Sequence, residues 1–201
     1  MDAAQEVYGT QYPLINRYVD ILTTTAVEWG LLGPREADRV WDRHILNSAA
    51  LSELIPPSSA VADVGSGAGL PGIPVAILRP DVRMTLIEPL LRRSTFLTEA
   101  IQELEITDRV EVVRSRAEDH QQIYPVVLAR AVAPLDRLIA WCNPLRATGG
   151  VILALKGTSA THEVAAAQRQ LEIVRLDAEV LTVRAHPDAE SATVVRLSAR
   201  H

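Results

Sequence analysis

A glycine-rich segment is the part of the sequence best suited to bind a small molecule. It reads Asp-Val-Gly-Ser-Gly-Ala-Gly-Leu-Pro-Gly over residues 63–72, and a short apolar run precedes it. Glycines that follow a strand let the backbone approach a ligand closely, and open α/β sheets bind ligands at the carboxyl ends of their strands. Gly65, Gly67 and Gly69 have the spacing G-x-G-x-G. The dinucleotide fingerprint is G-x-G-x-x-G, and Leu70 stands where its third glycine is needed.

Two carboxylates near this segment discriminate between cofactors. Asp63 precedes the glycines, where it would oppose a pyrophosphate but favour an ammonium or sulfonium group. Glu88 ends the next apolar run, where a carboxylate can accept hydrogen bonds from both ribose hydroxyls. We therefore expect the segment to bind S-adenosyl-L-methionine, which carries both cations and no phosphate. The alternative is an NAD-dependent oxidoreductase. The expected cofactor-binding residues here are Asp63, Gly65, Gly67, Gly69, Leu70 and Glu88.

Two basic residues end apolar runs that read as strands. Arg130 follows Val-Val-Leu-Ala, and a buried arginine needs a partner. That partner is either a structural ion pair or a bound group, namely the cofactor carboxylate or a target base. Lys156, the single lysine, ends the longest apolar strand, where it could equally be structural or contact a nucleic-acid phosphate.

Two further basic pairs are candidates for nucleic-acid binding. Arg92 and Arg93 open a predicted helix, although helix starts favour acidic residues, so they suggest an anionic partner. The alternative is a solvated helix face. Arg43 and His44 lie on a predicted helix near the N-terminus, and His44 could instead be a packed core histidine.

Hydrophobic periodicity predicts the elements that position these residues. Residues 1–58 read as helical, with helices over 14–29 and 34–54 separated by Gly30 to Gly33. From residue 60, strands alternate with helices. The expected strands are 60–64, 83–88, 109–114, 126–130, 150–156, 172–183 and 192–198, and the expected helices are 69–78, 90–104, 135–145 and 163–171.

This alternation predicts an α/β fold. Strands separated by helices form a parallel sheet covered on both faces. The segment between the last two strands is too short for a parallel crossover, so the final strand should be antiparallel. We expect a Rossmann-like, mostly parallel seven-stranded sheet. The expected division is a helical N-terminal extension over 1–58 and the sheet domain over 59–201.

Composition excludes several classes of protein. The chain has 201 residues, a net charge of −5 and one cysteine, so it cannot form an internal disulfide. Its apolar runs fall short of the roughly 18 residues of a membrane span, and its N-terminus lacks the pattern of a signal peptide. The negative charge argues against a general nucleic-acid coat. We expect a cytoplasmic protein, and a monomer because there is no long apolar seam.

Several segments, in order and spacing, resemble the bacterial GidB/RsmG family. Residues 63–74 resemble its D-V-G-[ST]-G-x-G-x-P-G-[IL]-P segment. Five further matches are 43–48 to R-H-[IL]-x-D-S, 88–97 to D-S-x-x-K-R-x-x-F-L, 115–118 to S-R-x-E, 129–133 to S-R-A-x-A, and 155–157 to L-K-G. Asn47, Glu88, Arg92 and Ala129 depart from that pattern, and Gly30-Leu31-Leu32 replaces its Asn-Leu-Thr.

The resemblance implies a class I S-adenosylmethionine-dependent methyltransferase fold and activity. Such enzymes methylate N7 of a guanine in 16S ribosomal RNA, guanine 527 in the bacterial numbering. The implied partner is that RNA, in the small ribosomal subunit or an assembly intermediate. The implied cofactor contacts are Gly65, Leu70, Ala117, Glu118 and Arg130.

The reaction asks for positioning rather than acid–base chemistry. Guanine N7 has an in-plane lone pair and no proton to remove, so we expect neither a general base nor a metal. Arg130 and Lys156 are the expected catalytic residues, as donors to guanine O6. Pyrimidine C5 methylation would need a nucleophilic cysteine, and Cys142 is better explained by packing. The alternatives are a non-catalytic ribosome-assembly module that binds the same cofactor, and a methyltransferase acting on a small molecule or a protein.

Overall fold

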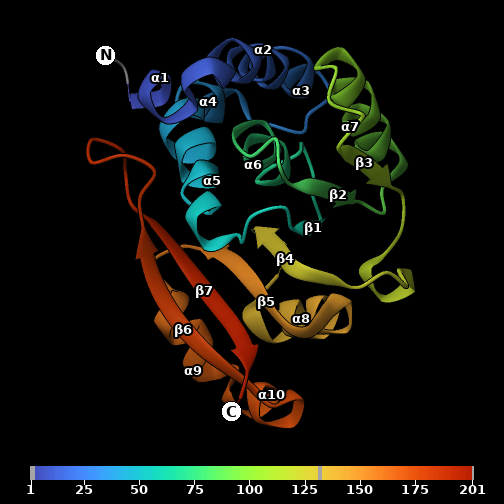
Figure 1. Cartoon of the computed structure of the whole chain (residues 1–201), viewed down its shortest axis with the longest axis vertical. Coiled ribbons are helices and arrows are strands. Elements are labelled where there is room, and N and C mark those ends of the chain that lie inside the picture. Colours follow the sequence, from blue (N-terminus) through green and yellow to red (C-terminus); the bar gives the residue numbers. More distant parts are fainter. Residues whose placement is uncertain (1–2, 131–132, 201) are drawn as a thin grey trace.

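A seven-stranded sheet organises the computed structural model, which describes residues 3–130 and 133–200 (Figure 1). The strand order is β3-β2-β1-β4-β5-β7-β6. The strands are β1 (Ala60–Val64), β2 (Arg83–Ile87), β3 (Val110–Val113), β4 (Tyr124–Arg130), β5 (Arg146–Lys156), β6 (Leu176–Val183) and β7 (Ala192–Ala199). This confirms the predicted number of strands.

The direction of each strand follows from its connection. Helices connect β1 to β2, β2 to β3 and β4 to β5, and a segment with a 3₁₀ turn connects β3 to β4. These five strands pair in parallel. β7 returns after a short loop and pairs antiparallel with both β5 and β6. The predicted antiparallel last strand is therefore confirmed. β7 also lies between β5 and β6, which leaves β6 and β3 as the two edges.

Helices cover both faces of the sheet (Figure 1). One face carries the N-terminal helices with α6 (Gly72–Leu78) and α7 (Leu91–Glu103), and the other carries α8 (Leu135–Cys142), α9 (Ala160–Ala166) and α10 (Gln168–Val174). The N-terminal elements are α1 (Ala3–Tyr8), α2 (Tyr12–Thr23), α3 (Thr25–Glu28), α4 (Pro34–Ala37), a π-helix (Val40–Leu46) and α5 (Asn47–Ala49). Short 3₁₀ turns are Gly9–Gln11, Ser52–Leu54, Ala117–Asp119 and Asn143–Leu145.

Alternation along the central strands builds the two cores. Val126 and Leu128 of β4 join the core under the N-terminal helices, while Val127 and Ala129 join the core under α8. Successive side chains of a strand point to opposite faces, so a parallel strand buried on both faces reads as a continuous apolar run.

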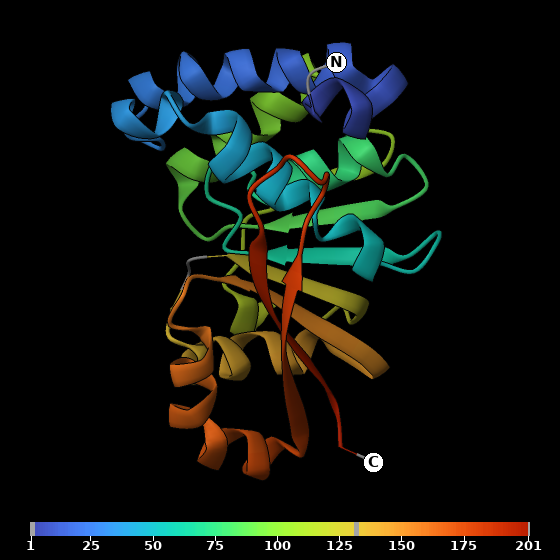
Figure 2. The ribbon, with the colours of Figure 1, turned by 90° about the vertical axis from the view of Figure 1, so that its left-hand side faces the viewer.

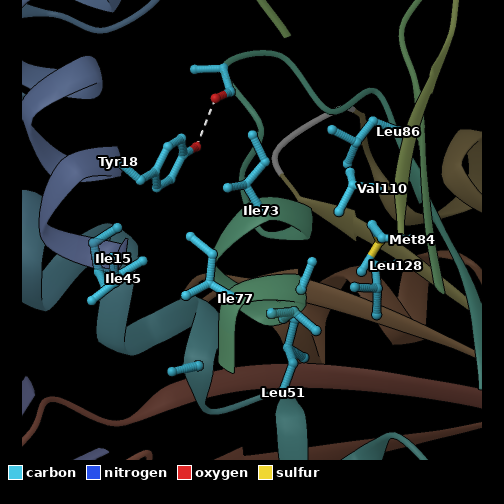
Figure 3. Packing of buried hydrophobic residues seen from close by; sticks show 14 of the residues in the cluster. Ile15, Tyr18, Ile45, Leu51, Ile73, Ile77, Met84, Leu86, Val110 and Leu128 are labelled. Atoms are coloured by element: carbon cyan, nitrogen blue, oxygen red, sulfur yellow. Dashed lines mark hydrogen bonds between the residues drawn. The ribbon is translucent and has the colours of Figure 1, made fainter. Parts of the chain in front are cut away.

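The N-terminal helices pack on the same core as the sheet. Ile15 of α2 and Ile45 of the π-helix are fully buried in the same core as Ile73 of α6 (Figure 3). The Tyr18 hydroxyl donates a 2.7 Å hydrogen bond to the backbone carbonyl of Ala68 in the glycine turn (Figure 3). The division of the chain after residue 58 stays a prediction, and these contacts join the extension directly to the site.

Several predicted elements differ from the observed ones. The helix expected over 34–54 consists of α4, the π-helix, α5 and a 3₁₀ turn, and the helix expected over 163–171 is divided into α9 and α10. The helix expected over 14–29 is interrupted after Thr23, where the Thr23 and Thr24 hydroxyls donate to carbonyls of the preceding turn and compete with the helix. The strand expected from residue 172 begins at Leu176, because α10 continues to Val174 and ends at Arg175 in the left-handed conformation (φ 54°).

The loop between β6 and β7 reaches the N-terminal helices (Figure 2). His186 Nε2 lies 2.9 Å from Glu6 Oε2, and Arg39 Nη2 lies 3.2 Å from Glu190 Oε1. The first and last parts of the chain therefore meet beside the carboxyl end of β5. Over residues 3–130 and 133–200, no helix is both long and apolar enough to cross a membrane.

Candidate active site

The predicted site residues gather at the carboxyl edge of the parallel strands. β1 leads into Gly65, Glu88 follows β2, Arg130 ends β4, and Lys156 ends β5. Two cavities open there. Neighbouring strands β1 and β4 separate them, and the paired residues Val64 and Ala129 lie just before Gly65 and Arg130.

The first cavity has a volume of about 320 Å³ and lies over β1, β2 and the turn after β3. Of the predicted cofactor contacts, it is lined by Gly65, Glu88, Ala117 and Glu118. Arg93 and Trp141 also line it. Its volume is at the lower end of the range for small-molecule sites. Sequence reasoning did not assign Trp141 to the site, because a tryptophan on an apolar helix gives the same pattern as core packing.

The glycine turn has a backbone that other residues would strain. Gly65, Gly67 and Gly69 have positive φ angles of 72°, 58° and 97°. At Gly69 a β-carbon would lie 2.4 Å from Ile73 Cδ1 and 2.9 Å from the Tyr18 hydroxyl. The turn therefore depends on glycine both for its conformation and for close packing under α2.

Glu88 fixes the turn against the neighbouring strand. Its residue surface is 1% exposed, its Oε2 accepts a 3.0 Å hydrogen bond from the Gly67 amide, and its Oε1 accepts a 3.1 Å bond from the Leu90 amide. Arg93 Nη1 lies 3.9 Å from the same carboxylate. Each carboxylate oxygen has a second lone pair. Glu88 can therefore hold the turn and still accept a ligand hydroxyl.

Asp63 is buried beneath the turn rather than at the cavity wall. It is fully buried, and its Oδ2 accepts a 3.1 Å hydrogen bond from the Gly72 amide at the start of α6. Its Oδ1 has no hydrogen-bond partner in the described part of the chain. Burial raises the pKa of this carboxyl to about 7, against the opposing effect of the Gly72 hydrogen bond. Direct contact of Asp63 with a cofactor cation stays a prediction.

The second cavity has a volume of about 610 Å³ and lies over the ends of β4 and β5. Arg43, Arg130 and Lys156 line it, together with Asn47 and Glu163. Arg130 Nη2 donates a hydrogen bond to His44 Nδ1, while Arg130 Nη1 is buried with no hydrogen-bond partner among the described residues. Burial lowers the pKa of Arg130. Arg130 therefore lines this cavity with one of its donor groups not engaged by any described residue.

Lys156 is held in place by its neighbours. Its side chain is 6% exposed, and its Nζ donates to the Ala133 carbonyl at 2.7 Å and to Glu163 Oε2 at 2.8 Å. Ser159 donates to the other oxygen of Glu163 at 3.0 Å. Lys156 thus ties the segment after β4 to α9. Two residues of the family-like 129–133 segment, 131 and 132, lie outside the described residues.

The remaining predicted residues lie around these cavities without lining them. His44 is 5% exposed and faces Arg130 from the π-helix. The Arg92 guanidinium lies 5.9 Å from the centre of the Trp29 ring, in a cation–π arrangement. Gly67, Gly69 and Leu70 belong to the turn beneath the first cavity.

Cys142 is the last residue of α8 and belongs to the core between that helix and the sheet. The side chain is fully buried, and burial raises the pKa of its thiol to about 12. A neutral, enclosed thiol is a poor nucleophile, which agrees with a packing role.

Comparison with known proteins identifies the family. Residues 11–191 match the GidB family model, described as rRNA small subunit methyltransferase G. The chain belongs to the GidB family. A relative from Kineococcus radiotolerans is 49% identical over 205 residues, spanning 100% of this chain and 80% of its own. One from Mycolicibacterium smegmatis is 50% identical, spanning 96% of this chain and 84% of its own. Both carry the name ribosomal RNA small subunit methyltransferase G.

Solved structures share the fold of this GidB-family chain at low identity. Precorrin-6y C5,15-methyltransferase from Geobacter metallireducens aligns with a TM-score of 0.56 and 18% identity, covering 85% of this chain and 91% of its own. TYW2 from M. jannaschii, solved in complex with AdoMet, aligns with a TM-score of 0.59 and 16% identity, covering 77% and 74%. These likenesses establish the Rossmann-like methyltransferase fold that the sequence predicted.

Proposed function

We propose that this chain transfers the methyl group of S-adenosyl-L-methionine to N7 of a guanine in 16S small-subunit ribosomal RNA, with guanine 527 of the bacterial numbering as the target. Membership of the GidB family supports the reaction class. The observation that carries the proposal is the pair of cavities at one sheet edge, with the glycine turn and Glu88 in one and Arg43 and Arg130 in the other.

The first cavity fits the cofactor. The buried Glu88 carboxylate can accept the ribose hydroxyls, since each of its oxygens uses only one lone pair on a backbone amide. Gly65 has no side chain, so its backbone forms part of the cavity wall. Ala117 and Glu118 lie on the 3₁₀ turn where the adenine would bind. When bound, S-adenosyl-L-methionine supplies an electrophilic methyl group on a sulfonium sulfur.

The second cavity fits the target base. Arg130 and Arg43 line it, and Arg130 Nη1 is a buried donor in need of an acceptor. We assign Arg130 to the guanine O6 edge, where it would orient N7 toward the first cavity. Lys156, predicted as a second donor, is assigned to positioning, because Ala133 and Glu163 already engage its ammonium group.

The chain contributes to the reaction mainly by alignment. An in-plane lone pair on N7 needs no base, so the protein must hold the base and the methyl donor in line. Val64 and Ala129 are paired in register on neighbouring parallel strands, which lie about 4.8 Å apart. The residues that follow them, Gly65 and Arg130, therefore begin side by side at the boundary of the two cavities.

Exposed arginines are proposed to meet the RNA backbone. The side chain of Arg93 is 46% exposed beside the first cavity, that of Arg43 is 51% exposed beside the second, and Arg92 lies on the surface of α7 over Trp29. His44, predicted as an RNA contact, is 5% exposed, and we assign it to Arg130 instead. We further propose that the protein works as a cytoplasmic monomer on the small subunit or on an assembly intermediate.

A labelled-methyl assay tests this function. Small subunits from a strain that lacks this modification are incubated with labelled S-adenosyl-L-methionine and the wild type, Glu88→Ala, or Glu99→Ala as an exposed control on α7. We expect wild type and Glu99→Ala to label the small-subunit RNA, and Glu88→Ala to bind the cofactor about 10- to 100-fold more weakly, since a buried acceptor to the ligand is lost. Cofactor binding by the wild type without labelling of subunits or free RNA would favour the non-catalytic module. Label on a protein or small molecule alone would favour the other alternative.

A further inference from the structure

A chain of three polar side chains links the N-terminal extension to the end of β4. Glu36 lies on α4, His44 on the π-helix, and Arg130 at the last position of β4, 86 residues after His44. π-helical turns are rare and often occur at functional sites. Here the π-helix directs an almost fully buried histidine toward the arginine of the second cavity.

The contact with Arg130 fixes the tautomer of His44. A guanidinium can only donate, so His44 Nδ1 must accept the hydrogen bond from Arg130 Nη2 and carry no proton. The proton of the neutral ring is then on Nε2. That atom lies 3.0 Å from Glu36 Oε2, a close contact that is off the line of a hydrogen bond, so the carboxylate acts on the ring mainly through its charge.

Burial and nearby charge explain why the ring is neutral. Burial comes first and the nearby Arg130 second in lowering the pKa of His44 to about 4, while Glu36 opposes them and Arg43 adds to them. A neutral imidazole can accept from a guanidinium, whereas an imidazolium would repel it. The arrangement is therefore stable at neutral pH without a carboxylate bound directly to Arg130.

One carboxylate serves both arginines of the cavity. Glu36 Oε1 lies 3.1 Å from Arg43 Nη1, and Glu36 Oε2 faces His44, which in turn binds Arg130. The Nη1 atom of Arg130 is left without a partner among the described residues. With Nη2 anchored by His44, the guanidinium can present Nη1 in one orientation.

We infer that Glu36 and His44 are positioning residues for methyl transfer, which orient the Arg130 guanidinium in the cavity that takes the target base. The inference rests on the proposed function. Neither side chain would touch the base or the cofactor, since neither lines the two cavities. Their effect should appear in the turnover of the bound complex, and not in cofactor affinity.

Conservative and disruptive variants separate positioning from packing. An Asn amide oxygen can occupy the place of Nδ1, so His44→Asn retains the acceptor for Arg130, whereas His44→Leu removes it. We expect His44→Leu and Glu36→Leu to lower kcat by about 10- to 100-fold through misplacement of the guanidinium. His44→Asn should stay within about threefold of the wild type by the same reasoning. Glu190→Ala, which breaks a comparable surface pair with Arg39, is the matched control and should not change kcat.

Two readouts keep the inference distinct from the proposed function. Calorimetric titration with S-adenosyl-L-methionine should give the same Kd for all four variants and the wild type. Long-range ¹H–¹⁵N spectra of the wild type should show His44 protonated at Nε2 only, and Arg130→Met should perturb its Nδ1 signal. An active wild type with equal kcat in His44→Leu, or a ring protonated at Nδ1, would overturn the inference alone. A wild type that binds cofactor but methylates nothing would overturn the proposed function, whatever the tautomer.

Discussion

Asp63 and His44 should give the protein two pH dependences of opposite sign. Burial raises the pKa of Asp63 from its ordinary 3.8 to about 7, and burial with Arg130 lowers the pKa of His44 from 6.5 to about 4. Between these values, folded Asp63 keeps a proton that the unfolded chain releases. Folded His44 lacks a proton that the unfolded chain takes up below about pH 6.5. Asp63 therefore costs stability as the pH rises, and His44 costs stability as the pH falls.

The magnitudes follow from the shifts. A difference of one in pKa corresponds to about 1.4 kcal/mol. From about pH 5 to about pH 8, Asp63 titrates through about 7 and lowers the free energy of unfolding by about 3 kcal/mol. From about pH 8 to about pH 5, His44 lowers it by about 2 kcal/mol, since the unfolded imidazole becomes charged. The contributions of the two residues partly cancel in the wild type.

Single substitutions should expose each contribution. Asp63→Asn keeps an oxygen for the Gly72 amide and loses the titration, so its stability should fall toward pH 5 more steeply than that of the wild type. His44→Asn keeps the acceptor for Arg130, so its stability should fall toward pH 8 more steeply. Urea unfolding followed by tryptophan fluorescence at about pH 5, 6.5 and 8 measures both. Asp136→Asn, an exposed aspartate on α8, is the control.

The change of unfolding free energy with pH, compared between each variant and the wild type, tests this prediction. The difference in unfolding free energy between Asp63→Asn and the wild type should grow by about 3 kcal/mol from about pH 5 to about pH 8. The difference between the wild type and His44→Asn should also grow, by about 2 kcal/mol, over the same interval. Parallel profiles for the wild type and both variants would refute the reasoning, because they would mean that neither group changes its proton affinity on folding.

Three further substitutions test the contacts that hold the glycine turn and Lys156 in place. Tyr18→Phe leaves a glycine-turn carbonyl unpaired and should lower the unfolding free energy by about 1–2 kcal/mol, measured by urea titration; an unchanged midpoint would contradict the tie between α2 and the turn. Gly72→Ala places a β-carbon 2.5 Å from Leu86 Cδ2 and should cost about 1–3 kcal/mol and weaken cofactor binding in calorimetry, whereas wild-type values would count against the close packing. Lys156→Met removes the ammonium group from Glu163 and should cost about 1–3 kcal/mol in thermal unfolding together with most methyl transfer; full activity would argue against its positioning role.

The sheet could be predicted because its signals are local. The apolar run before the glycine turn gave the bounds 60–64, the same as those of β1. The short loop before the last strand required an antiparallel β7. The helix breaks in the N-terminal region were harder, because Thr23 and Thr24 compete with the helix through side-chain hydrogen bonds that periodicity does not register.

The sequence could predict only those site residues that have a local signal, such as a strand end or a glycine spacing. Strand ends and glycine spacing point to Glu88 and Gly65, which line the first cavity. They do not point to the partner of Arg130, because His44 is 86 residues away and meets it only through tertiary packing. Glu36 looks like any acidic residue near a helix start, and its contacts with Arg43 and His44 depend on the π-helix. The burial of Lys156 likewise depends on a tertiary contact, with Glu163 of α9.

The identity of the methylated nucleoside tests whether the second cavity takes a guanine that is methylated at N7. Small-subunit RNA labelled by the wild-type protein is digested to nucleosides, separated and weighed by mass spectrometry, and the modified position is mapped by cleavage at the methylated base. We expect 7-methylguanosine at a single position, lost in Arg130→Met while cofactor binding is retained. A different methylated nucleoside, or full methylation by Arg130→Met, would contradict the assignment of the second cavity to guanine.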